Sequence, residues 1–236
     1  MATALRPQAP LGFADGQLEA LKWVGMAAMF CDHIGRHLLG MPHESWAFIA
    51  GRLAFPLFAL VLGLNLAREG DRAARCVRVT WRLLAWGAVS VLPSIWARGD
   101  PALLNVLFTL GLGAALCWML ESPAHAAWRA LACLAIATAS WFVEFGTGGV
   151  FLVAATYLYA IRRGGGLATV VIVLLLATAW LNAIFGGWPA FFGTLAALPV
   201  AWLAQRLPLR VPRWQWLFYL TYPVHLAVIG ALKAAG

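Results

Sequence analysis

The sequence predicts an all-α protein, a bundle of helices that crosses a membrane many times. Hydrophobic residues make up 63% of the 236-residue chain and charged residues 11%, against about 25% charged residues in an ordinary soluble domain. The mean hydropathy is +0.81. Apolar segments alternate with short breaks along the whole chain, without a long linker or an internal repeat. We therefore expect a single polytopic membrane domain over residues 1–236.

About nine transmembrane helices are expected, in an order set by the breaks between apolar segments. The fifth and sixth segments are short for a span of about 20 residues, so eight to ten spans fit the pattern. Gly, Pro and charged residues mark the breaks, as in REGDRAAR and RLPLRVPR. The expected helices are 17–39, 46–67, 77–97, 102–120, 128–143, 148–161, 167–185, 189–204 and 214–233.

Arginine residues gather at alternate breaks, and Arg98 is the exception at the other breaks. The positive-inside rule therefore places the N-terminus and the basic loops in the cytoplasm. These loops account for the net charge of +8, so we expect a lipid bilayer as the environment and no nucleic acid as a partner. The arginines at the basic breaks are Arg68, Arg72, Arg75, Arg78, Arg82, Arg129, Arg162, Arg163, Arg206, Arg210 and Arg213.

The first segment carries ionisable side chains that a membrane helix normally excludes. Each charge near a bilayer centre costs roughly 2.5–3.5 kcal/mol on insertion scales, and such residues usually face an internal cavity with a function. Lys22 and His33 are eleven residues apart, which is about three turns, so both project from nearly one face. Met26 and Met29 fall on the same stripe. This face predicts a groove with a cation at its cytoplasmic end and an imidazole at its outer end.

Asp32 lies roughly 100° around the helix from His33. Arg52 of the second segment is expected at about the same depth, because the hairpin between the two segments turns near GMPHE. Two roles are open for Asp32: an ion pair with Arg52, or a contact that orients His33 for catalysis. Arg36 and Arg52 are also assigned to a cavity at the outer side, called the acceptor cavity because a second substrate would bind there.

No metal site is expected. His33 and His37 have the i, i+4 spacing of metal ligands, but the HExxH context and a third ligand are missing. The cysteines form no CxxC pair, so we expect reduced or buried thiols. They are Cys31, Cys76, Cys117 and Cys133.

The run REGDRAARCVRVTWR places arginines three and four residues apart on the helix that enters the membrane. They are either an ordinary topology signal or a phosphate clamp, because arginine binds phosphate through forked hydrogen bonds. Under the second interpretation the cofactor-binding residues are Lys22, Asn65, Arg72, Arg75, Arg78 and Arg82.

Two further segments supply polar groups near the outer side. Asn105 and Thr109 lie about one turn apart on the fourth segment and are assigned to the same acceptor cavity as Arg36 and Arg52. Pro223 interrupts the last segment beside three polar rings, which form either a cavity wall or an aromatic packing kink. These rings are Tyr219, Tyr222 and His225.

A groove with this distribution of charge suits a long ligand with phosphates at one tip and a reactive group at the other. Acetyl-CoA has that form, with an anionic nucleotide, an extended pantetheine arm and a terminal thioester. We therefore expect acetyl-CoA as the acyl donor. His33 would act either as a general base or as a carrier of the acetyl group.

Four blocks covering most of the chain resemble the TraX family, including its TrbP-like members: LKWVGMAAMFCDHIGRHL, GRLAFPLFALVLGLNLAR, NVLFTLGLG and FYLTYPVHL. The resemblance implies an inner-membrane enzyme of bacteria that acetylates the N-terminal amine of a conjugative pilin. More loosely, Lys22 before His33, and Arg75 with Arg78, are similar to motifs of the membrane acyltransferase-three family. This similarity implies that His33 is catalytic and that the basic residues lie near CoA.

The sequence is also compatible with three other functions. A glycan or lipid hydroxyl could replace the amine as acceptor. A small transporter or channel could use Lys22, His33 and Arg52 to line a pathway, although the paired broken helices of transporters are not evident. A non-catalytic assembly factor for conjugation is the third alternative.

Overall fold

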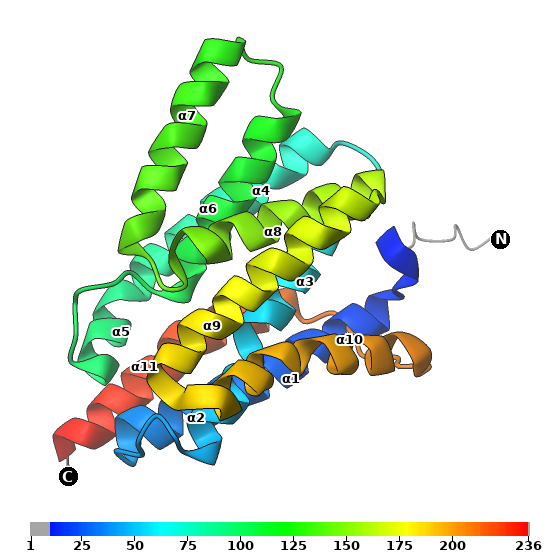
Figure 1. The fold of residues 1–236 in the computed structure, drawn as a ribbon. Helices are drawn as coiled ribbons and strands as arrows, with labels where there is room; N and C mark the ends of the chain where they lie inside the picture. The colour runs from blue at the N-terminus through cyan, green and yellow to red at the C-terminus, as the bar shows by residue number, and fades with distance from the viewer. Residues whose placement is uncertain (1–9, 236) are drawn as a thin grey trace, which may run out of the picture.

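The computed structural model describes residues 10–235, and within this range the chain is all-α (Figure 1). A π-helical turn, η2 (Ile34–Leu38), directly follows the first helix. The α-helices are α1 (Asp15–His33), α2 (Trp46–Gly51), α3 (Ala54–Leu66), α4 (Arg72–Val89), α5 (Val91–Arg98), α6 (Val106–Glu121), α7 (Ala126–Ala139), α8 (Gly146–Arg162), α9 (Gly165–Leu195), α10 (Ala197–Arg206) and α11 (Gln215–Ala235).

The expected segments coincide with these elements, but several of them are divided. The second segment forms α2 and α3, and the third forms α4 and α5. The expected break between the seventh and eighth segments lies inside α9, where Gly186 and Gly187 leave the helical conformation just before Pro189. Gly187 has a φ of 63°, which favours glycine. The chain turns back at this end of α9 and continues into α10 (Figure 1).

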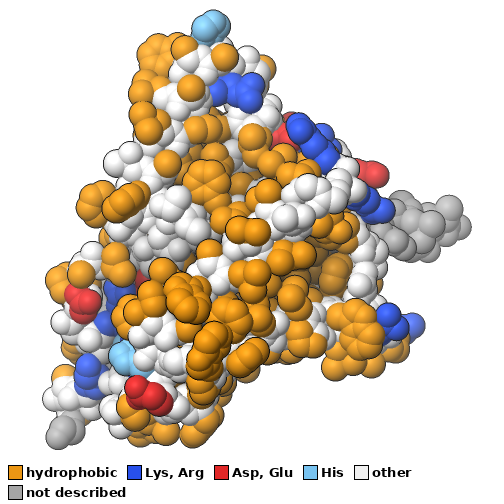
Figure 2. Space-filling view, in the orientation of Figure 1, with side chains coloured by type: hydrophobic (Ala, Val, Ile, Leu, Met, Phe, Trp, Pro, Cys, Tyr) orange, Lys and Arg blue, Asp and Glu red, His pale blue; other side chains and the backbone are white. Residues whose placement is uncertain are grey.

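Three helical stretches of the described chain are long and apolar enough to cross a membrane: Trp46–Leu66, Gly165–Arg206 and Trp216–Ala235. Val106–Glu121 and Ala126–Phe142 are apolar but shorter. The all-α fold is confirmed over residues 10–235, while the number of nine spans stays a prediction. Hydrophobic side chains cover much of the face in Figure 2, and large exposed ones include Trp128, Trp180 and Ile184. Such an apolar surface is typical of contact with lipid.

Small residues allow the helices around the site to approach closely. A Cβ added to Gly113 of α6 would lie 2.7 Å from the Cβ of Val153 on α8. At the C-terminal end of α1, a Cβ added to Gly51 of α2 would lie 2.3 Å from the Cβ of Asp32. In the same region a Cβ on Gly35 would meet Ala47 at 2.5 Å. The close contact of α1 and η2 with α2 therefore depends on glycine at these two positions, because any larger residue would clash.

We expect Gly51→Ala to lower the stability of the protein in detergent by about 1–3 kcal/mol, the usual cost of an extra methyl group in a packed site. Thermal unfolding would measure the loss. Gly148→Ala on α8 is the matched control, because a Cβ at Gly148 meets nothing within 4 Å. Equal melting temperatures for the two variants would show that α2 does not need this close approach.

Candidate functional site

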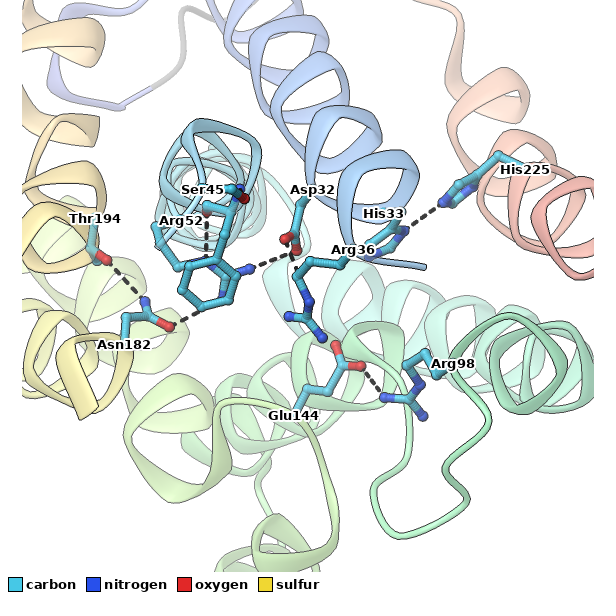
Figure 3. Close-up of polar contacts among 11 residues, drawn as sticks. Asp32, His33, Arg36, Ser45, Arg52, Arg98, Glu144, Asn182, Thr194 and His225 are labelled. Atoms are coloured by element: carbon cyan, nitrogen blue, oxygen red, sulfur yellow. Dashed lines mark hydrogen bonds and ion pairs between the residues drawn. The ribbon is translucent and has the colours of Figure 1, made fainter. Parts of the chain in front are cut away.

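Two histidines from the first and last helices meet at the centre of the candidate site. His33 is the last residue of α1, and its Nδ1 lies 2.7 Å from Nε2 of His225 on α11 (Figure 3). Nδ1 of His225 lies 2.9 Å from the carbonyl oxygen of Thr221. Both histidines are half-buried. The sequence assigned both residues to the site, and the structure brings them into direct contact.

The helix changes its winding at this point. The π-helical turn η2 begins immediately after His33, and such turns are rare and often occur at functional sites. The ring of His37 lies in this turn, 5.6 Å from the ring of His33. The expectation of one regular helix over 17–39 is therefore corrected by η2, which hydropathy alone does not reveal.

Asp32 belongs to a different contact on another side of α1. Its Oδ2 accepts a hydrogen bond of 2.6 Å from Nη2 of Arg52, and both residues are buried. Arg52 also donates to the carbonyl of Phe48 at 3.1 Å and to Asn182 of α9 at 3.2 Å. Within residues 10–235 no hydrogen bond joins Asp32 to His33. Of the two roles considered for Asp32, the structure contains the ion pair with Arg52.

Sequence reasoning missed Glu144, which joins this end of the bundle from the loop before α8. Its Oε1 accepts a hydrogen bond of 2.5 Å from Nη1 of Arg98, at the end of α5. Desolvation raises the pKa of the Glu144 carboxyl, and the charge of Arg98 opposes that rise. The side chain of Arg36 lies between Asp32 and Glu144 (Figure 3). A lone acid between two apolar segments, in FVEFGTGG, is the signal that could have found it.

Asn105 and Thr109 form hydrogen bonds to the backbone of neighbouring segments. Asn105 caps α6, because its Oδ1 accepts from the Leu107 amide at 3.1 Å, and it donates to the Gly87 carbonyl at 2.9 Å. The hydroxyl of Thr109 donates to the backbone carbonyl of Glu144. Both residues are buried. Their assignment to the acceptor cavity is therefore revised to a structural contact.

A cleft opens between α1, α3, α4, α6 and α11 along part of the predicted face of α1, because Lys22, Met26 and Met29 line it and His33 does not. It holds about 990 Å³ of space between the atoms, counting the open region at its mouth. Its inner wall is largely apolar. Residues at the two ends and along the α1 wall include Lys22, Met26, Met29, Asn65, Arg82, Arg213, Tyr219 and Tyr222. The rings of Tyr222 and His33 are inclined at 65° to each other, with ring centres 6.4 Å apart.

Cations line one end of the cleft, near the start of α1. Lys22, Arg82 and Arg213 all contribute to this lining. Buried Glu19 lies between two of them, with Oε2 2.5 Å from Nζ of Lys22 and Oε1 3.8 Å from Nε of Arg213. Lys22, Asn65 and Arg82, which the sequence assigned to cofactor binding, all line this cleft, and their role in binding stays a prediction. Sequence reasoning missed Glu19 and Arg213.

The remaining arginines of the predicted stripe do not line the cleft. Arg75 donates to the carbonyl oxygens of Leu66 at 3.1 Å, Arg68 at 2.5 Å and Glu69 at 2.8 Å, so it closes the loop between α3 and α4. Arg72 is 3.4 Å from Glu121 of α6. Arg78 is exposed. The spacing of the arginines predicts that they share a helix face. It does not reveal which carbonyl or carboxylate oxygens each guanidinium contacts.

The fold and the site together define an all-α protein with membrane-compatible helices and a cleft that leads from a cationic end toward a histidine pair. The model of the TraX family, described as TraX protein, matches residues 17–233. The chain belongs to the TraX family, as its sequence blocks suggested.

Two relatives share most of their length with this chain. Protein TraX of Escherichia coli is 29% identical over 237 residues, which covers 95% of this chain and 90% of the relative. Protein TraX of Escherichia coli (strain K12) is 30% identical over 234 residues, with the same coverage of 95% and 90%. No solved structure matches the chain.

We expect Asp32 and Arg52 to behave as one structural unit. Asp32→Asn or Arg52→Gln alone should destabilise the protein by about 3–5 kcal/mol, because each leaves an unpaired buried charge. The double variant should lose clearly less than the sum of the two single losses. Unfolding of all four proteins in the same detergent gives the coupling energy. Additive losses would contradict the pairing.

Proposed function

We propose that this protein is a membrane acetyltransferase, which moves an acetyl group from cytosolic acetyl-CoA to an acceptor amine at the outer side of the bacterial inner membrane. One observation carries the proposal: the cleft has cations at one end and reaches Met29 and Tyr222 at the other. His33 lies four residues beyond Met29 on α1, about one turn further. A phosphate-rich donor and a catalytic imidazole would thus occupy opposite ends of one cleft.

The residues along the cleft fit the donor. Lys22, Arg82 and Arg213 supply positive charge for phosphate groups. Arg82 also lies against the ring of Trp216, 5.2 Å from its centre, and this contact restricts the guanidinium. The apolar wall between the two ends suits an extended arm. Bound in this direction, the donor would carry its thioester toward Tyr222 and His33.

His33 is the group that would handle the proton in the transfer. The acceptor amine attacks the thioester carbonyl, and an imidazole nitrogen of His33 takes the proton that the amine loses. The C–N bond forms as the C–S bond breaks, and the leaving thiolate takes the proton from His33. A free α-amine has a pKa of about 7.7–8.0, so correct placement of the base matters more than its strength.

Membership of the TraX family, together with the implied role of that family, supports a pilin as the acceptor. The mature N-terminus of a processed pilin would lie at the outer face. The loops with most of the basic residues lie at the upper right of Figure 1, and the end of α1 with His33 lies at the lower left. Under the positive-inside rule this arrangement favours a cytoplasmic N-terminus and an outward-facing His33.

We expect His33→Ala to abolish acetyl transfer while the protein still inserts and still binds CoA. The assay is thiol release from acetyl-CoA with a purified conjugative pilin as acceptor, followed by intact mass of the pilin. His125→Ala is the matched control, because His125 is exposed in the loop before α7. Wild-type turnover by the His33 variant would overturn the assignment. An acetyl adduct on His33 itself would instead identify a two-step route.

We expect Arg82→Ala to weaken CoA binding by about 10- to 100-fold, as for the loss of a hydrogen bond to a charged group worth about 1.5–3 kcal/mol. Arg78→Ala, one turn away on the same helix but exposed, should leave the affinity unchanged. Calorimetric titration of both variants with CoA makes the comparison. An equal loss for Arg78→Ala would place the phosphates on the exposed arginines of α4 and not in the cleft.

A further inference from the structure

We infer that His225 is a positioning residue: it fixes the tautomer of His33, so that Nε2 of His33 is left without a proton and ready to accept one. The hydrogen-bond chain from His33 through His225 to the carbonyl of Thr221 carries this inference. Its consequence for turnover rests on the proposed acetyl transfer, but the tautomer itself does not.

The contact between the two histidines is a hydrogen bond in the ring plane and not a face-to-face stack. The rings are parallel within 8° and their centres are 5.0 Å apart. The joined nitrogens are 2.7 Å apart. The centre distance is close to this separation plus the two ring radii, so the rings lie edge to edge in one plane. A proton on the line between the nitrogens has good hydrogen-bond geometry.

The direction of the chain follows from counting protons. A carbonyl oxygen only accepts, so Nδ1 of His225 must carry the hydrogen that bonds to Thr221. A neutral imidazole has one N–H, so Nε2 of His225 must accept. The donor to it is therefore Nδ1 of His33. Neutral His33 then has a bare Nε2, and no hydrogen bond joins this atom to the rest of residues 10–235.

The ring of His225 is held in this orientation by its neighbours. Phe30 of α1 lies 4.7 Å away between ring centres, and Tyr222 of α11 lies 5.5 Å away. These contacts come from both helices that contribute to the pair. They restrict rotation of His225 and so preserve the acceptor for Nδ1 of His33.

The arrangement does the work that a buried carboxylate does for the histidine of a hydrolase triad, which is to hold the imidazole in one tautomer. A carboxylate would add a charge to an apolar region, where charges are costly. Asp32 is adjacent in sequence but is bonded to Arg52. A neutral imidazole backed by a carbonyl orients His33 without that charge. After His33 takes up a proton at Nε2, the bond to His225 can share the positive charge.

The test is the tautomer of His33, read by nitrogen NMR of histidine-labelled protein in detergent micelles. Two-bond proton–nitrogen correlations distinguish an Nδ1–H ring from an Nε2–H ring. We expect the wild-type protein to have His33 as Nδ1–H. His225→Phe, which keeps a ring but removes the acceptor, should shift His33 toward Nε2–H. His225→Gln, whose amide oxygen can accept from Nδ1–H, should keep the native tautomer.

Turnover should follow the tautomer. We expect kcat to fall by about 100-fold or more in His225→Phe, within the usual contribution of a positioned base, with the KM for acetyl-CoA unchanged. His225→Gln should recover a substantial part of kcat. His125→Phe, in an exposed loop, is the control for the loss of a histidine.

The outcomes distinguish the inferred tautomer of His33 from the proposed acetyl transfer. An Nε2–H ring at His33 in the wild-type protein would overturn the inference, and this measurement needs no variant to fold. An Nδ1–H ring that is unchanged in His225→Phe would also overturn it. The expected tautomers in a protein that transfers no acetyl group would leave the inference standing and reject the proposed function.

Discussion

The ion pair between Asp32 and Arg52 is the interaction on which the rest of the site depends. It joins the C-terminal end of α1 to the short segment between α2 and α3, and Arg52 extends the contact to Asn182 on α9. Asn182 in turn donates to Thr194, beyond the bend at Gly186 and Gly187. Because His33 follows Asp32 directly, a fixed Asp32 also fixes the backbone that carries the imidazole. The charges are tolerated among apolar helices because each has a partner inside the protein.

The sequence predicts a large part of this arrangement, for reasons that are local. Hydropathy locates the helices, because a sufficiently long apolar run indicates a helix whatever the rest of the fold. Helical spacing places Lys22, Met26 and Met29 on one face, and that face lines the cleft. The hairpin turn places Arg52 beside Asp32, since two antiparallel helices match in depth when their connection is short.

Other features depend on contacts between distant parts of the chain, which spacing does not reveal. Arg75 belongs to a regular stripe, yet its donors are taken by the carbonyls that follow α3. Glu144 meets Arg98 across 46 residues of sequence. The π-helical turn after His33 has no hydropathic signal, because a change in winding leaves the composition unaltered. The edge-to-edge contact of His33 with His225 likewise requires the packing of α1 on α11.

The origin of the two histidines has a consequence for biosynthesis. His33 comes from the first helix and His225 from the last, separated by 192 positions. The hydrogen-bond chain therefore cannot form on a nascent chain that lacks α11. A chain that stops early would keep most of the cleft walls, since α1, α3, α4 and α6 all precede α11. It would lack the partner that orients His33. The orientation of His33 is thus set only when the last helix has packed against the first.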